Sequence, residues 1–197
     1  MHRSRHPQSV KTPKYNPKKK TKRYKEQSPE KVVEFQKAIS GIPADKIAYV
    51  DETGIDTYLH RPFCRAKRGV KIIGAVSGKK FKRTSIVSAL TGNRPIEPLQ
   101  YGGSMDSVLF ESWFEMRLLP ALPKNTTIVM DNASFHRKSR LIPLAESTGH
   151  TLLFLPPYSP ELNLIEHFWA WLKARLRKIL HLFDGLDSAI SDCFHVR

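Results

Sequence analysis

Apolar and polar positions follow two different periods along the chain, and together they predict a domain made of both strands and helices. Short apolar runs between turn-forming residues are typical of buried or half-buried strands. Apolar positions that recur every three or four residues are typical of helices with one buried side. The predicted strands cover residues 47–50, 70–76, 84–90, 96–101, 126–130 and 151–155, and the predicted helices cover 28–43, 139–147 and 162–180, with a further helix opening at 104–106.

The order of these elements indicates a mixed sheet. Residues 77–80, Ser-Gly-Lys-Lys, form a hairpin-type connection between two early strands, so the first half of the chain predicts an antiparallel meander. The later strands alternate with helices, which predicts parallel crossover connections. We therefore expect an α/β fold with helices on both faces of the sheet.

Positive charge is concentrated near the N-terminus. The formal net charge is +15, and residues 1–25 hold ten Lys and Arg without one Asp or Glu. Such an excess is expected where phosphates are neutralised, although a solvated basic tail without a partner has the same composition. We predict four segments: a basic flexible arm or linker over 1–27, a linker helix over 28–43, the main domain over 44–183 and a C-terminal tail over 184–197.

The composition argues against several classes of protein. No apolar run approaches the roughly 20 residues needed to cross a bilayer, so no membrane partner is expected. The N-terminus is basic and polar with no apolar stretch behind it, which is unlike a secretory signal. Two cysteines, Cys64 and Cys193, are too few for a disulfide framework or a zinc site. A reducing, cytoplasmic setting is expected.

Two acidic residues stand where predicted strands end. Asp51 directly follows the run 47–50, and Asp131 directly follows the run 126–130. Two strands that lie side by side and finish at the same edge bring such carboxylates together, at the edge where open α/β sheets bind ligands. Carboxylate oxygens are the ligands that Mg²⁺ and Mn²⁺ prefer, and a pair of such ions serves to cut phosphodiesters. Taken singly, however, an Asp at a strand end is more often a turn-former or a helix cap.

A third acid is expected from the last predicted helix. Glu166 borders the apolar stripe of residues 162–180, so we expect it to face the core side of the helix instead of bulk solvent. A carboxylate in that position needs a site or a partner. Glu161 is the rival candidate, but its place just before the helix suits a residue that offsets the helix dipole, and we favour Glu166.

The residues around these acids resemble the catalytic blocks of bacterial insertion-sequence transposases of the DDE endonuclease superfamily, which are allied to the mariner-like elements. The blocks are Tyr-Val-Asp-Glu-Thr-Gly at 49–54, Asp-Asn-Ala-Ser-Phe-His at 131–136, and Leu-Pro-Pro-Tyr-Ser-Pro-Glu-Leu-Asn at 155–163, continued by Ile-Glu-His-Phe-Trp at 165–169. The resemblance covers about residues 45–180 in order. The 34 residues between Asp131 and Glu166 are a separation typical of that group.

This resemblance implies a ribonuclease H-like fold, with a five-stranded mixed sheet. It implies that Asp51, Asp131 and Glu166 are the catalytic residues and hold Mg²⁺ or Mn²⁺, with two ions expected. The implied reaction is metal-dependent cleavage of phosphodiester bonds at the inverted-repeat ends of a transposon, followed by attack of the freed 3′-hydroxyl on target DNA. No covalent enzyme intermediate is expected, and the implied location is the bacterial nucleoid.

Supporting roles and partners follow from the same resemblance. Asn132 and His136 are expected to bond a phosphate or a ligand carboxylate, although a purely structural histidine fits as well. DNA contacts are expected from basic residues of the arm, of the segment before residue 70 and of the last helix: Lys18, Lys19, Lys20, Lys22, Arg23, Arg65, Lys67, Arg68, Lys173 and Arg177. For any one of them, a solvated surface charge is the simpler explanation.

Two departures from the family pattern stand out. Leu164 occupies a position where many relatives have proline, which loosens the start of the last helix and removes no ligand. The helix-turn-helix region that recognises transposon ends in such transposases has no counterpart here. We therefore expect a separately encoded or fused helix-turn-helix partner, and by analogy a homodimer on DNA.

Two alternative functions stay open at this point. One is an inactive or DNA-binding remnant of a transposase, which binds without turnover. The other is a ribonuclease H-like nuclease that acts on RNA–DNA hybrids or Holliday junctions, against which the Pro-Pro-Tyr-Ser-Pro block argues.

Overall fold

The early part of the chain builds the meander half of one five-stranded sheet. The computed structural model describes residues 24–59, 67, 69, 71, 73, 78 and 81–195. Strand β1 (Ile47–Asp56) pairs antiparallel with β2 (Arg83–Thr91), and β2 pairs antiparallel with β3 (Arg94–Tyr101). The β2–β3 turn is Gly92-Asn93, with positive φ at both residues, the backbone that a tight hairpin turn requires.

Two later strands complete the sheet on the other side of β1. Strand β4 (Thr127–Met130) lies parallel to β1, and β5 (Thr151–Phe154) lies parallel to β4, which gives the order β3-β2-β1-β4-β5. The sheet is therefore mixed and five-stranded, as the sequence predicts, with β1 at its centre.

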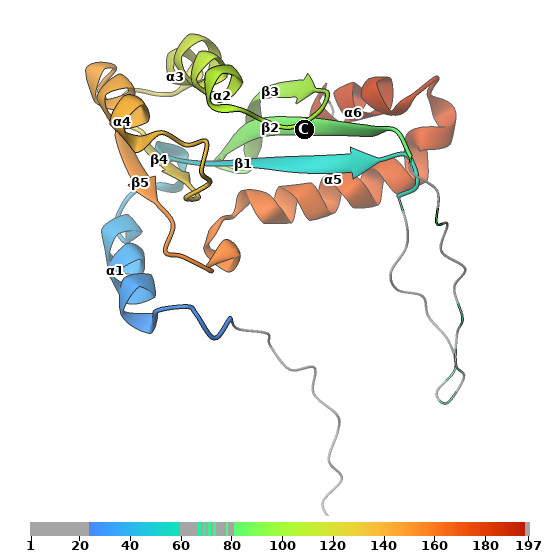
Figure 1. Ribbon diagram of the computed structural model, residues 1–197, viewed down its shortest axis with the longest axis horizontal. Coiled ribbons are helices and arrows are strands. Elements are labelled where there is room, and N and C mark those ends of the chain that lie inside the picture. The colour runs from blue at the N-terminus through green and yellow to red at the C-terminus, as the bar shows by residue number, and fades with distance from the viewer. Residues whose placement is uncertain are drawn as a thin grey trace, which may run out of the picture.

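Helices cover both faces, and each face has its own apolar core (Figure 1). On one face lie α1 (Pro29–Ile39), α5 (Ile165–Ile179) and α6 (Leu186–His195), packed on the odd-numbered side chains of β1 such as Tyr49. On the other face lie α2 (Ser107–Trp113), α3 (Leu119–Ala121) and α4 (Lys138–Ser147), packed on the even-numbered side chains such as Val50. Alternation along β1 thus divides its side chains between two environments.

The strand boundaries correct two expectations. The predicted strand 70–76 and the predicted hairpin connection 77–80 lie largely outside the described residues, and the described Lys71 and Ile73 belong to no strand. The third meander strand is instead residues 94–101. Strand β1 also does not end at Val50 but runs to Asp56, because its antiparallel pairing with β2 continues after its pairing with β4 has stopped at Tyr49.

Helix boundaries agree better with the sequence. Ser28 caps α1, with its hydroxyl accepting from Lys31 N at 3.4 Å, and Asp106 caps α2 by accepting from Leu109 N at 2.8 Å. After α2 the chain continues as a π-helical turn over Phe114–Leu118 before α3. Val108, at the start of α2, and Met116, in this turn, are exposed.

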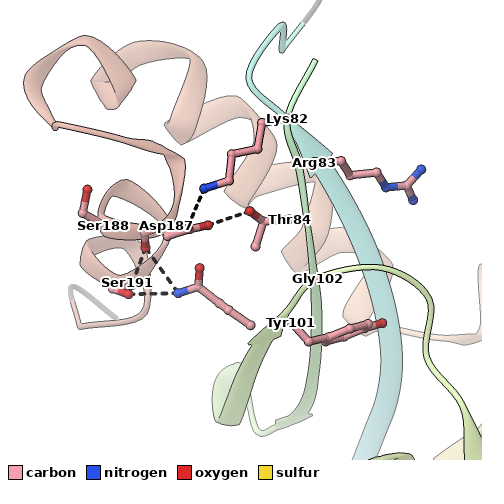
Figure 2. Close-up of a pocket in the computed structure, with 9 residues that line it drawn as sticks. Lys82, Arg83, Thr84, Tyr101, Gly102, Asp187, Ser188 and Ser191 are labelled. Atoms are coloured by element: carbon pink, nitrogen blue, oxygen red, sulfur yellow. Dashed lines mark hydrogen bonds and ion pairs between the residues drawn. The ribbon is translucent and has the colours of Figure 1, made fainter. Parts of the chain in front are cut away.

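Residues 184–197 are not a tail throughout, because they contain α6. Its apolar side is buried against α5, and its polar side faces β2 and β3 (Figure 2). There Asp187 accepts from Thr84 Oγ1 and forms a 3.1 Å ion pair with Lys82, while Gln100 Nε2 donates to Ser191 Oγ at 2.9 Å. Hydrogen bonding to Thr84 and then to Lys82 holds the pKa of Asp187 below its usual value. None of the described helices is long and apolar enough to cross a membrane.

Candidate active site

Asp51 lies in β1 at the level where that strand loses its parallel neighbour. On one side it pairs with Ser88 of β2, and on the other side the β1–β4 pairing has ended two residues earlier. Its side chain points to the face that α5 covers, where Trp169 Nε1 donates a 3.0 Å hydrogen bond to Asp51 Oδ2. Trp169 lies within the apolar stripe predicted over residues 162–180, which places it in the core, and it is buried at 1% exposure, but it also carries this polar contact.

The Asp51 carboxylate is in an unfavourable environment for a negative charge. Burial, and after it the nearby charges of Glu166 and Glu52, raise its pKa to about 7, against the hydrogen bonds from the Glu52 backbone and Trp169. Glu166, in the first turn of α5, is therefore within electrostatic reach of Asp51. It is exposed, contrary to the expectation that it turns away from solvent.

The start of α5 is fastened to β1 beside Asp51. Asn163, buried at 4% exposure, donates from Nδ2 to the carbonyl of Val50 at 3.2 Å. One turn earlier, Glu161 lies in the 3₁₀ turn Pro160–Leu162 and accepts from Gln27 Nε2, so it is engaged away from Asp51. The Pro-Pro-Tyr-Ser-Pro loop and Asn163 together set where Glu166 enters the site.

Asp131 directly follows β4, next to β1. The parallel register pairs Tyr49 with Val129, and continuing that register by two residues sets Asp51 opposite Asp131. The Asp131 carboxylate has its own donors: Ala133 N donates to Oδ1 at 2.9 Å, and His136 Nδ1 lies 3.0 Å from the same oxygen. Burial acts to raise its pKa, but these donors and the charge of His136 hold it below the usual value.

His136 is a buried ring held between two aromatic side chains. Its ring centroid lies 4.2 Å from that of Phe110 and 4.5 Å from that of Phe135. Nδ1 faces Asp131, and Nε2 lies 3.5 Å from Glu52 Oε1, an ion-pair contact that does not satisfy hydrogen-bond geometry. Burial acts to lower its pKa, yet contacts with Asp131 and Glu52 raise it to about 9. His136 thus contacts the carboxylate of Asp131, one of the three acids that the sequence predicts as cation ligands.

The three predicted catalytic acids are only partly gathered. Asp51 and Glu166 influence each other electrostatically, whereas Asp131 is directed to His136 and Ala133. Across residues 24–59 and 81–195 and the isolated described positions between them, no three acidic, histidine or cysteine side chains lie close enough to hold a metal as a group. Still, the donors fit a hard divalent cation: they are carboxylate oxygens, and Asp51 bears like-charge repulsion that a cation relieves.

The remaining predicted residues have varied surroundings. Asn132 donates to Leu155 O at 2.7 Å and accepts from Lys138 Nζ at 2.6 Å, which ties the Asp131 loop to the end of β5. Arg177 donates to Leu59 O, and Lys173 is half-buried on α5. Of the other predicted DNA contacts, Lys67 is exposed, while Lys18, Lys19, Lys20, Lys22, Arg23, Arg65 and Arg68 lie outside the described residues.

Sequence reasoning overlooked Glu52 and Asn163 and gave Trp169 no polar role. For Glu52 and Trp169 a signal exists in hindsight. Adjacent acids on one strand point to opposite faces, so an Asp-Glu pair at 51–52 serves two faces. Trp169 stands three residues after Glu166, on the same side of a helix.

The chain is similar to known nucleases and transposases in sequence pattern and in fold. The family model of DDE superfamily endonucleases matches residues 46–188. A search of curated proteins returned no significant sequence match. Among solved structures, the Mos1 transposase paired-end complex with the left transposon end is 14% identical with a TM-score of 0.59, covering 92% of this chain and 63% of that one.

Two further structures extend the likeness. The Mos1 mariner paired-end complex with Mn is 15% identical with a TM-score of 0.60, over 91% of this chain and 60% of that one. A simian T-cell lymphotropic virus intasome in complex with PP2A regulatory subunit B56 gamma is 17% identical with a TM-score of 0.52, over 78% of this chain and 48% of that one. At these identities the likeness shows a common fold, the ribonuclease H-like fold, and the chain spans about three fifths of the Mos1 transposase chains.

The family match covers well over half of the 197 residues and contains all three predicted acids. The sheet order, with Asp51 on the central strand and Asp131 directly after the adjacent parallel strand, is the architecture that the sequence blocks imply. This protein belongs to the DDE superfamily endonucleases.

Proposed function

We propose that this chain is the catalytic domain of a DNA transposase, which cleaves phosphodiester bonds at transposon ends and transfers the freed 3′-hydroxyl to target DNA. The observation that carries the proposal is the state of Asp51: a partly buried carboxylate that Glu166 and Glu52 destabilise, with a second carboxylate, Asp131, directly after the adjacent parallel strand β4. Such crowding of acids is expected where a divalent cation supplies the missing positive charge.

The proposed ligands are Asp51, Asp131 and Glu166, with Mg²⁺ or Mn²⁺ and two ions expected. Bound divalent cations activate the attacking oxygen and stabilise charge on the leaving oxygen of a phosphodiester. Trp169 orients the Asp51 carboxylate by holding Oδ2, and Asn163 fixes the start of α5 and with it Glu166. Ala133 and His136 hold Oδ1 of Asp131. The proposal requires the half-exposed Asp131 carboxylate to reach the cations that Asp51 binds, which adjacent positions in the parallel register favour.

DNA is the proposed partner, and the Mos1 complexes with transposon ends support it. We also propose that a helix-turn-helix region, separately encoded or fused, recognises the transposon ends. A dimer on DNA remains part of the same proposal.

Nicking of supercoiled plasmid DNA with Mn²⁺ tests the reaction without knowledge of the end sequence. The wild-type chain is expected to nick, Asp131→Ala and Asp51→Asn are expected not to, and Glu146→Gln, a change of an exposed acid on α4, is the matched control. An oligonucleotide with a free 3′-hydroxyl, added to the plasmid, reports strand transfer as a covalent joint product.

Two further arms separate the alternatives. Preferential cleavage of an RNA–DNA hybrid or a Holliday junction would identify a nuclease of the same fold. DNA binding without nicking, together with no Mn²⁺-dependent rise in melting temperature, would identify a remnant and contradict the proposal.

A further inference from the structure

Two buried polar atoms face each other beside the proposed site, and neither has a hydrogen-bond partner among the described residues. They are Glu52 Oε1 and His136 Nε2, 3.5 Å apart. Buried polar atoms are nearly always satisfied in folded proteins, so an opposed pair of this kind needs an explanation. The explanation available here is mutual attraction, because His136 is the sole ion-pair partner of Glu52 within the described part of the chain.

His136 has little freedom to move away from this contact. Its side chain is 1% exposed, and Phe110 and Phe135 flank the ring at 4.2 and 4.5 Å between centroids. The two ring nitrogens therefore point in fixed directions: Nδ1 toward Asp131 Oδ1 at 3.0 Å and Nε2 toward Glu52. A protonated imidazole placed between two carboxylates is attracted to both, and its orientation is set by both.

Glu52 reaches His136 because of its place on β1. Asp51 and Glu52 are consecutive, so their side chains leave the strand on opposite faces. Asp51 meets Trp169 on the α5 side, while Glu52 meets His136, which packs on Phe110 of the α2 side. Two consecutive residues of the central strand thus contact side chains on opposite faces of the sheet beside the proposed site.

The Asp131 carboxylate is left with one oxygen engaged and one open. Oδ1 takes the contacts from Ala133 N and His136 Nδ1. Oδ2 accepts no hydrogen bond from any residue that the structure describes. A carboxylate fixed through one oxygen presents the other in a constant direction, which is how residues behind metal ligands commonly act.

We propose that Glu52 is a positioning residue that acts through His136: it fixes the imidazole that holds Asp131 Oδ1 and so directs Asp131 Oδ2 toward a divalent cation. The inference deepens the proposed function and rests on it. If Glu52 were itself a cation ligand, its effect on cation binding would not depend on His136. The two roles can therefore be told apart.

The test is a double-mutant cycle on Mn²⁺ binding, measured by calorimetry on the full chain. Glu52→Gln keeps the size of the side chain and removes its charge, and it is expected to weaken Mn²⁺ binding about 10- to 100-fold, the usual effect of a residue behind a metal ligand. His136→Gln is expected to weaken binding to a similar extent. The double variant is expected to bind no more weakly than His136→Gln alone, since Glu52 acts through the ring. Glu146→Gln is the matched control and leaves binding unchanged.

Nitrogen NMR of the His136 imidazole gives a second measurement, the resonances of Nδ1 and Nε2, which loss of packing alone is not expected to change. In metal-free protein, Glu52→Gln is expected to shift the Nε2 resonance of His136, and Asp131→Asn the Nδ1 resonance. If Glu52→Gln fails to fold, Glu52→Asp retains the charge with a shorter reach and is expected to give an intermediate loss of Mn²⁺ affinity.

The outcomes separate cleanly. Wild-type Mn²⁺ affinity in Glu52→Gln, or losses that add in the double variant, overturn the positioning role. Absence of Mn²⁺ binding by the wild-type chain removes the proposed cation site itself, and the inference with it.

Discussion

Asp51, in β1, and Asp131, directly after the adjacent parallel strand β4, are the same kind of residue, yet their surroundings differ in charge. Asp51 is partly buried beside Glu166 and Glu52, with Trp169 as its side-chain donor, and its pKa rises to about 7. Asp131 is half exposed, receives donors from Ala133 and His136, and has a lowered pKa. The charges that act on Asp51 are therefore repulsive, whereas Asp131 has a neighbour, His136, whose positive charge stabilises its carboxylate.

This difference indicates a division of roles within the proposed site. A cation that approaches the three acids gains most by neutralising Asp51, because repulsion there is uncompensated. Asp131 already has a partner, so its contribution to cation binding depends on its orientation more than on its charge. The comparison predicts that identical substitutions at the two positions have different consequences for the fold.

The largest expected effect is on activity. Asp51→Asn and Asp131→Asn are each expected to reduce Mn²⁺-dependent plasmid nicking on the order of 1000-fold or more, because cation-held charge stabilisation amounts to several kcal/mol. In metal-free protein their stabilities should diverge: Asp51→Asn melts higher than wild type, since repulsion is removed, and Asp131→Asn melts lower, since His136 loses its partner. Equal shifts of both variants in the same direction would break the comparison.

A second prediction concerns the pH dependence of metal-free stability. Because the folded pKa of Asp51, about 7, exceeds its unfolded value near 3.9, the unfolded chain releases this proton first. Stability from this group therefore falls as the pH rises from about 4 to about 7, by at most about 4 kcal/mol and by less where solvent reaches the carboxylate. Asp131, with its lowered pKa, contributes stability that is lost only as the pH falls below about 4.

Urea unfolding midpoints between pH 4 and pH 9 measure this dependence. Asp51→Asn is expected to flatten the fall between pH 4 and pH 7. His136, whose pKa is raised to about 9, adds a separate fall between about pH 6.5 and pH 9, which His136→Gln removes. Saturating Mg²⁺ is expected to abolish the Asp51 component, because the cation replaces the proton; an unchanged profile with Mg²⁺ would contradict the cation site.

A smaller effect is expected from the indole that supports Asp51. Trp169→Phe removes the donor to Asp51 Oδ2 and is expected to lower stability by about 2 kcal/mol, within the range for hydrogen bonds to charged groups. It should also raise the pKa of Asp51 further. Trp113→Phe is the matched control: Trp113 is 2% exposed on the opposite face, and its indole donates to a neutral acceptor, the carbonyl of Glu97. Both variants lose stability, but only Trp169→Phe should move the pH window.

The sequence predicted the strands and helices around this site better than the side-chain contacts within it. Apolar runs located β4 and β5 closely, because each of these parallel strands is a short apolar run bounded by turns. The end of β1 was misplaced because pairing with β2 carries the strand through polar residues 51–54, and apolar runs do not report pairing partners. The last helix was predicted from residue 162 but begins at Ile165, so Glu166 lies in its first turn. The exposure of Glu166 depends on how α5 lies against β1, which a helical stripe alone does not specify.

The contacts that distinguish Asp51 from Asp131 were beyond sequence reasoning. That His136 joins Asp131 to Glu52 depends on the loop 131–137 folding back over Phe110, a contact between segments more than twenty residues apart. The indole bond to Asp51 depends on the rotamer of a side chain already expected in the core. Long-range side-chain geometry of this kind leaves no periodic trace in the chain.

The smallest predicted effect tests the Asp51 side without touching Asp131. Leu164 precedes α5 with φ −65°, the value that proline imposes, and its backbone N–H donates no hydrogen bond within the described residues. Asn163 before it is extended at φ −91° and ψ 100°, as a residue preceding proline prefers.

Leu164→Pro is therefore expected to raise stability by about 0.4–1 kcal/mol by restricting the unfolded chain. Leu164→Ala, which removes the 45% exposed side chain without the ring, should give no such gain in urea unfolding. A loss of stability in Leu164→Pro would mean that the start of α5, and with it the position of Glu166 beside Asp51, depends on a backbone geometry that proline disturbs.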